Sequence, residues 1–440
     1  MIDHDIEEIL SPETAAGRLR ELRRSVEEVV TGTLAVDMHT HLFAPQFGRM
    51  SLWGVDDLLT YHYLIEEFFR VSNVAPEYFW SLPRARQADL IWEAIFVRRT
   101  PLSEAARGVV TVFTALGLDP RAPDLGPARE YFKEQNVDDH LNRVLELAGV
   151  SIIVMTNDPL DAEEARVWMS RVEPDRRFRA ALRMDRILNG WGRAAEALTA
   201  QGYEVDASLG GKTIRELRRF LDFWIGVMKP LYLAVSLPDD FTFPDDSPRS
   251  RLIRDGVLPA CRDHGLPFAL MIGVKRGVNP ALRSAGDGLG RADVGALIRL
   301  CADHPDNRFL ATFLSRENQH EMCVAARKFS NLMPFGCWWF LNNPSIVSEI
   351  TRERIEMLGP SFIAQNSDAR VLEQLIYKWR HARAALVDAL YEAYSRLVPS
   401  GWLVTTQEIR RDAAQLLSDN FRDWVGLTDA PNGKEGPDGA

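Results

Sequence analysis

Eight short apolar runs recur along this chain of 440 residues, and segments with helical spacing separate most of them. The runs span residues 34–41, 151–159, 178–185, 231–238, 267–273, 308–315, 331–340 and 361–370. Such alternation is typical of βαβ units that build a parallel sheet. Eight units favour the α/β class with a (β/α)8 barrel of the TIM type. A doubly wound sheet is the alternative, but no GxGxxG loop supports dinucleotide binding.

A long helical stretch interrupts this alternation after the first run. Residues 45–147 show helical apolar spacing, broken by prolines, and no convincing strand. We therefore expect residues 31–44 and 148–427 to form the barrel, with 45–147 as a helical insertion after the first strand. Residues 1–30 are expected to hold an N-terminal helix, and 428–440 to be a disordered tail.

Composition excludes several classes of function. The net charge of −10 argues against a nucleic-acid-binding protein. No run of about 18 apolar residues indicates a membrane span, and the acidic N-terminal residues show no signal peptide. The four cysteines are widely spaced without a CxxC pair, so we expect reduced, mostly buried thiols in a cytoplasmic protein. The oligomeric state is open, although apolar surface on the insertion could join copies into a homo-oligomer.

The first run ends in a pair of histidines. His39 and His41 follow a short apolar stretch in VDMHTHLF, and residues i and i+2 of a strand project to one face. Two imidazoles on one face suit a borderline metal ion such as zinc. On the pair alone, a metal site and a hydrogen-bonded structural pair are about equally plausible.

A carboxylate near the other end of the chain could complete this site. Asp368 closes the eighth run, which neighbours the first run in a closed barrel. Two imidazoles and one carboxylate would leave a coordination position open for water or substrate. Arg370 could bind a substrate oxyanion or lower the pKa of Asp368. The alternatives are a helix N-cap for Asp368 and a surface ion pair for Arg370.

Other residues are candidates for substrate contact. Arg183 ends the third run, where a guanidinium needs a partner, either Asp185 or a substrate carboxylate. Trp338 ends the seventh run and is assigned to the substrate pocket, although aromatic residues there also form core. His62 and Tyr63 lie in the helical stretch LLTYHYL, where packing with a satisfied polar tip is the competing interpretation.

The His39-x-His41 pair with Asp368 resembles the amidohydrolase superfamily of metal-dependent barrels. Longer stretches resemble the uronate isomerase family within it, over about residues 15–425. These stretches are HTHLFAPQFG, SLWGVDDLLTYHYL, MTNDP, ALRMD, SRENQH, FSNLMPFGCWWF and SFIAQNSDARVLEQLIYKW. The resemblance implies an isomerase that interconverts D-glucuronate with D-fructuronate, and D-galacturonate with D-tagaturonate, through an enediol.

The resemblance also implies roles for the candidate residues. His39, His41 and Asp368 would hold one divalent metal ion, for which we expect zinc although manganese also fits. Tyr63, Asp368 and Arg370 would act in proton transfer. His62 and Arg183 would contact the hexuronate substrate near its carboxylate.

One departure bears on the number of metal ions. Two-metal amidohydrolases carry a Lys or Glu after strand four and a His after each of strands five and six. Here the fourth run ends at Ser236-Leu237-Pro238, and the fifth carries Met271 where the main uronate isomerase branch has a nearby His. We therefore expect one metal ion. The alternatives are a metal-dependent hydrolase or decarboxylase of the same superfamily, and a non-catalytic sugar-acid-binding barrel.

Overall fold

The computed structural model describes residues 12–170 and 175–428. Within these residues, seven parallel strands pair in the order β1-β2-β3-β4-β5-β7-β8, and β6 pairs antiparallel with β5. The strands are β1 (Ala35–Thr40), β2 (Val150–Asn157), β3 (Phe178–Arg183), β4 (Leu233–Pro238), β5 (Phe268–Lys275), β6 (Gly288–Leu289), β7 (Phe309–Phe313) and β8 (Leu332–Pro334). The predicted α/β barrel class is confirmed, while the short β6 was not predicted.

Both faces of this sheet are buried, which explains why its strands read as continuous apolar runs. Side chains such as Val36, Ile152 and Ala234 form a cluster inside the curled sheet. Their neighbours along the strands, such as Ile153 and Val235, pack outward against the helices. The helices outside the insertion are α2 (Pro12–Gly32), α10 (Ala162–Met169), α11 (Asp185–Asn189), α12 (Trp191–Ala200), α13 (Thr213–Met228), α14 (Pro248–Leu252), α15 (Leu258–Asp263), α16 (Val294–Asp303), α17 (Gln319–Ala326), α18 (Pro344–Leu358), α19 (Gln374–Ser395), α20 (Thr406–Ala414) and α21 (Asn420–Val425).

The eighth predicted strand is wrong as a regular strand, but its residues still close the sheet. Ile363 makes a single parallel bridge to Phe335 beside β8. A few residues later, the Asp368 N–H donates to the His39 carbonyl at 3.1 Å, and the His41 N–H donates to the Ala369 carbonyl at 2.7 Å. Asp368 also adopts a φ of 52°, outside the range of a regular strand. Residues 361–369 are called the closing segment below.

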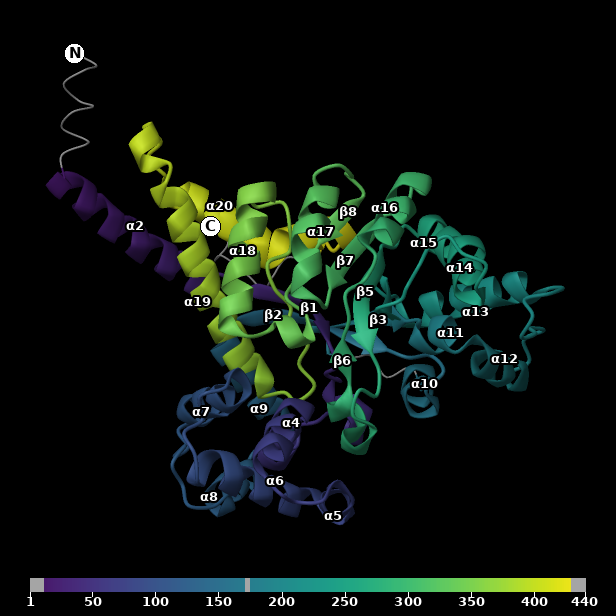
Figure 1. Ribbon diagram of the computed structural model, residues 1–440, viewed down its shortest axis with the longest axis horizontal. Helices are drawn as coiled ribbons and strands as arrows, with labels where there is room; N and C mark the ends of the chain where they lie inside the picture. Colours follow the sequence, from purple (N-terminus) through teal and green to yellow (C-terminus); the bar gives the residue numbers. More distant parts are fainter. Residues whose placement is uncertain (1–11, 171–174, 429–440) are drawn as a thin grey trace, which may run out of the picture.

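The insertion between β1 and β2 is helical, as predicted, and lies below the barrel in Figure 1. Its elements are η1 (Pro45–Met50), α3 (Val55–Leu59), α4 (His62–Val71), α5 (Pro76–Ser81), α6 (Arg84–Trp92), η2 (Glu93–Val97), α7 (Glu104–Leu116), α8 (Gly126–Lys133) and α9 (Val137–Ala148). Prolines mark several of these boundaries, because proline is tolerated in the first turn of a helix. Pro76 begins α5, and Pro83 directly precedes α6.

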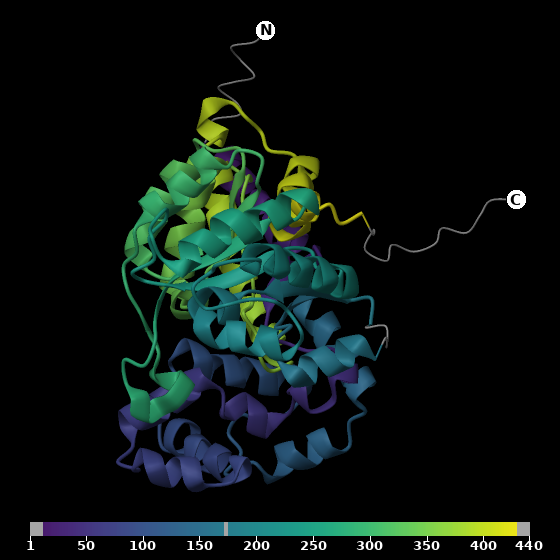
Figure 2. The same cartoon turned by 90° about the vertical axis from the view of Figure 1, so that its right-hand side faces the viewer.

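A loop from the barrel reaches back over this insertion. After β5 the chain forms η4 (Pro280–Gly286), which packs against α4 and α5. The Trp80 indole N–H donates to the Ala281 carbonyl at 2.9 Å, and the Arg283 guanidinium lies 4.5 Å from the centroid of the Trp80 ring. Figure 2 shows this loop beside the purple and blue helices of the insertion. The insertion is therefore held by barrel residues far from it in sequence.

The N-terminal helix predicted within residues 1–30 is present as α2, which packs against α19 and α20. Residues 1–11, and all but the first residue of the tail expected at 428–440, lie outside the described residues. The four cysteines are free and buried, as expected. Among the described residues, no helix has the length and apolar character needed to cross a membrane.

Glu164, on α10, gives the fold a testable pH dependence. Its side chain is 6% exposed and accepts hydrogen bonds from the Asp158 N–H and the Asn157 amide. Burial outweighs these bonds and raises the pKa of Glu164 from 4.5 to about 7. The folded chain therefore binds the proton more tightly than the unfolded chain, so this carboxyl costs stability as pH rises from 4.5 to 7.

We expect Glu164→Gln to be more stable than the wild type at pH 8, by up to about 3 kcal/mol, because glutamine keeps the acceptor and cannot ionise. At pH 4 the difference should vanish or reverse. Urea unfolding of both proteins across this range measures it. A stability difference that does not change with pH would contradict the prediction.

Candidate active site and metal centre

Three predicted metal ligands converge at the end of β1. The Nε2 atoms of His39 and His41 lie 3.6 and 3.4 Å from the Asp368 Oδ1. Tetrahedral coordination at ligand distances of about 2.0–2.1 Å requires ligand atoms about 3.3 Å apart. His39 and Asp368 are buried, whereas the His41 side chain is 27% exposed. The group therefore has the spacing of a metal site with one side open.

The protonation states also fit a metal site. Burial lowers the pKa of His39 to about 3 and lowers that of His41. Burial alone would raise the pKa of Asp368, but its interactions with the two histidines outweigh this effect and bring the pKa to about 2. Neutral imidazoles and an ionised carboxylate are the forms that bind a metal ion. Within the described part of the chain, the His39 Nε2 and the Asp368 Oδ1 make no hydrogen bond, so both are available as ligands.

Two residues that the sequence analysis missed fix the orientation of the histidines. The Thr156 hydroxyl donates its single proton to the Thr40 carbonyl at 2.8 Å and lies 2.9 Å from the His41 Nδ1. That Nδ1 must therefore donate, which leaves the lone pair on the Nε2 that faces Asp368. Tyr232 similarly donates to the Met38 carbonyl and lies 3.4 Å from the His39 Nδ1.

The position of Asp368 depends on another missed residue, Asp37. The Asp37 carboxylate accepts from the Ser367 N–H at 3.0 Å and from the Trp379 indole at 2.8 Å. Burial raises the pKa of Asp37 to about 6. These bonds tie β1, the closing segment and α19 together directly beside Asp368. Asp37 directly precedes Met38 and His39, but the HxH pattern gives it no role, so only the fold reveals its partners.

We expect Thr156→Val to weaken metal binding by about 10- to 100-fold, because the partner that orients the His41 ring is lost. Valine has nearly the same shape, so the thermal unfolding temperature should change little. Competition with a chelating dye measures the affinity. The same affinity in the variant and the wild type would show that Thr156 does not orient the ligand.

His62 and Tyr63 are brought together at the start of α4. Tyr61 precedes the helix as its N-cap residue, and the His62 ring lies 4.4 Å from the Tyr63 ring. The charges of Asp368 and Arg370 both act on the pKa of His62, which burial lowers to about 3. Burial raises the pKa of Tyr63 well above its usual value. Burial therefore favours the neutral form of the Tyr63 hydroxyl.

The remaining candidate site residues, Arg183, Arg370 and Trp338, each have a different environment. Arg183 has the expected partner, since its guanidinium lies 3.1 Å from the Asp185 carboxylate. Arg370 is exposed, although its charge is among those that act on the pKa of His41. Trp338 is 3% exposed and packs in the cluster inside the sheet. Its neighbour Trp339 lies 5.6 Å from the His62 ring, which places the second tryptophan beside the site.

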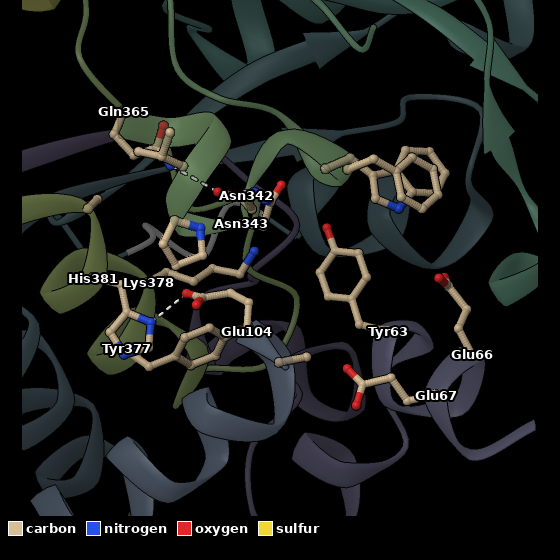
Figure 3. Close-up of a pocket in the computed structure, with 16 residues that line it drawn as sticks. Tyr63, Glu66, Glu67, Glu104, Asn342, Asn343, Gln365, Tyr377, Lys378 and His381 are labelled. Carbon is tan, nitrogen blue, oxygen red and sulfur yellow. Dashed lines mark hydrogen bonds and ion pairs between the residues drawn. The ribbon is translucent and has the colours of Figure 1, made fainter. Parts of the chain in front are cut away.

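A cavity of about 210 Å³ lies next to these residues, and the three metal-ligand candidates are not part of its wall. Tyr63 and Trp339 line it together with Lys378 of α19. Figure 3 shows the Tyr63 side chain between Lys378 on one side and Glu66 on the other. The sequence gives no signal for Lys378, because it lies between large apolar residues near the start of α19.

One metal ion fits this arrangement better than two. Among the described residues, His39, His41 and Asp368 are the one group of three or more His, Cys, Asp or Glu side chains whose atoms converge, all within 4.8 Å. Met271, at the strand-five position, is buried inside the sheet. Over residues 12–170 and 175–428, no second set of ligands of this kind stands beside the first.

Known structures resemble this one over nearly its whole length. A uronate isomerase from Bacillus halodurans is 51% identical, with a TM-score of 0.92 over 93% of this chain and 97% of that chain. A uronate isomerase from Thermotoga maritima is 16% identical, with a TM-score of 0.72 over 91% of this chain and 97% of that one. A glucuronate isomerase from Caulobacter crescentus is also 16% identical, with a TM-score of 0.71 over 96% and 97%.

No family model and no curated protein matches this chain. The two structures at 16% identity support the fold alone. The similarity at 51% identity covers nearly all of both chains and is enough to show the family. The chain belongs to the uronate isomerase family.

Proposed function

We propose that this chain isomerises hexuronates, interconverting D-glucuronate with D-fructuronate and D-galacturonate with D-tagaturonate. The observation that carries this proposal is the convergence of His39, His41 and Asp368 beside His62 and Tyr63, in a chain 51% identical to a uronate isomerase. A divalent metal ion held by the three ligands would act as a Lewis acid toward the sugar oxygens. We propose zinc, because two imidazoles and a carboxylate are a common zinc ligand set.

The remaining steps are assigned to side chains. Isomerisation moves a proton from C2 to C1 and shifts hydroxyl protons between O1 and O2 through an enediol. Tyr63 takes the C2 proton and returns it to C1, while Asp368 exchanges the hydroxyl protons. The charge of Arg370, which acts on the neighbouring Tyr61 and His62, would favour loss of the Tyr63 proton when substrate is bound.

Recognition of the substrate carboxylate is assigned to Arg183 and His62. A guanidinium binds a carboxylate through two parallel N–H donors, and Arg183 already holds one carboxylate, that of Asp185, at 3.1 Å. Trp338 is proposed to support this pocket from inside the sheet. We also propose a cytoplasmic location, in which the four buried thiols stay reduced.

The deciding experiment combines metal analysis with product analysis. We expect about one zinc ion per chain and conversion of D-glucuronate to a keto acid of unchanged mass. A hydrolase or decarboxylase would give products of different mass, and a binding protein would give no product. Full activity after chelation would refute the metal-dependent proposal.

A further inference from the structure

The cavity beside Tyr63 contains a buried amine that forms no direct ion pair among the described residues, although the charges of Asp368, Asp37 and Glu104 act on its pKa. Lys378 is 6% exposed, and within the described residues its Nζ has no hydrogen-bond partner. The Nζ lies 5.3 Å from the centroid of the Tyr63 ring. A buried ammonium without a partner costs several kcal/mol, so a lysine kept here calls for a purpose other than stability.

Other hydrogen-bond donors face the same space. The Trp339 indole N–H is buried without a partner in the described part of the chain, and so is the Asn342 amide nitrogen. Both residues line the cavity with Lys378. Gln365 holds Asn342 in place by donating to its carbonyl oxygen at 2.9 Å. This wall therefore offers a cation and two neutral donors to a group that carries several acceptors.

The acidic residues of the cavity should repel a bound anion only weakly. Burial raises the pKa of Glu66 to about 8, so this side chain is mostly protonated at neutral pH. The Glu104 charge is balanced by Arg107, which lies 2.6 Å from one of its oxygens, while the His381 Nδ1 lies 2.5 Å from the other. Glu67 accepts from the Ser103 hydroxyl. These groups can exchange hydrogen bonds with hydroxyl groups while adding little net negative charge.

We propose that this cavity binds a polyhydroxylated carboxylate, with the Lys378 amine donating to its acidic group and Glu66 and Glu104 bonding to its hydroxyls. The Trp339 and Phe340 rings, stacked with centroids 4.9 Å apart, add apolar surface for the C–H face of a sugar chain. The ligand class rests on the proposed function. Burial lowers the pKa of Lys378, so a bound anion would help to keep the amine charged.

Two sources could supply this chemistry. The cavity could hold the far end of the hexuronate that reacts at the metal site, since Tyr63 belongs to both. Lys378 would then bind the carboxylate in place of Arg183 and His62. It could also hold a second sugar-acid molecule. If the first source is right, removing Lys378 should change KM. If the second is right, removing it should change the number of molecules bound per chain.

The test compares Lys378→Met with the wild type and with Lys328→Met, which removes the same charge from an exposed lysine just before β8. Lys378→Gln serves as a second variant if methionine folds poorly. Each metal-loaded protein is assayed with D-glucuronate. Each is also titrated calorimetrically with D-glucarate, which has no carbonyl to isomerise. Because the Lys378 Nζ makes no hydrogen bond within the described residues, its removal should not lower the thermal unfolding temperature.

If the cavity holds the substrate's own chain, Lys378→Met raises KM and the D-glucarate Kd at least tenfold, with one molecule bound per chain. If it holds a second molecule, the wild type binds two, the variant binds one, and KM is unchanged. Unchanged KM, Kd and stoichiometry would overturn the subsite, even if the wild type isomerises uronates. A wild type that binds D-glucarate through Lys378 without turning over uronates would overturn only the proposed function.

Discussion

Replacing Tyr63 by phenylalanine is expected to lower kcat for D-glucuronate by about 10²- to 10⁴-fold, the range that a positioned acid–base group contributes. KM should change by only a few fold, because the ring still packs against His62 and beneath Lys378. Only the hydroxyl that is proposed to carry the C2 proton is lost. Steady-state kinetics with the metal-loaded variant measure both constants.

A matched control removes a different hydroxyl from the same insertion. Tyr131 lies on α8 against Phe132 and lines neither the metal site nor the cavity. Tyr131→Phe should therefore keep wild-type kinetics. If Tyr63→Phe kept near wild-type turnover, Tyr63 could not be the base. A fall in both variants would point to a loss of folding instead.

Much of the barrel could be predicted because its strands are buried on both faces. Such strands read as apolar runs with recognisable ends, and β1 to β5 follow that pattern. The closing segment also reads as an apolar run but pairs irregularly. There the Asp37 side chain takes the Ser367 N–H, and Asp368 turns to a positive φ. Tertiary hydrogen bonds of this kind leave no local signal in a sequence.

The residues of the candidate site also fall into those that the sequence predicts and those that it does not. His39, His41 and Asp368 follow from strand ends that a closed barrel brings together. Thr156 and Tyr232 could not be found, because their role depends on hydrogen bonds to histidines that are far from them in sequence. A threonine at the end of β2, next to the histidine strand, is the only hint that the sequence carries.

The aromatic and cationic residues near the site show a further limit of prediction from the sequence. A run of two tryptophans does not tell which ring faces inward, and Trp339 with its φ of 48° is the one beside His62. Likewise, Lys378 sits between apolar residues of α19, where a lysine usually reaches solvent. The insertion and the segment after β8 enclose Lys378 and make it a buried cavity residue.

Asp368→Asn is expected to weaken metal binding at least about 100-fold and to lower kcat at least about 10³-fold. Asparagine keeps the size and one ligand oxygen but removes the negative charge, and it cannot exchange hydroxyl protons. Direct ligands should cost more than the roughly 10- to 100-fold typical of residues that only orient them. Chelator competition gives the affinity, and turnover at saturating zinc separates lost binding from lost chemistry.

The backbone conformation at Asp368 should tolerate this substitution. Asp368 has a φ of 52°, in the left-handed region that asparagine adopts more readily than most residues, so the closing segment should keep its conformation. Asp158→Asn is the matched control. It neutralises another buried aspartate, just after β2, which pairs with Arg186 at 2.8 Å. If Asp368→Asn regained wild-type turnover at saturating zinc, Asp368 would only hold the metal ion and would move no proton. If its metal affinity also equalled that of the control, Asp368 would not be a ligand.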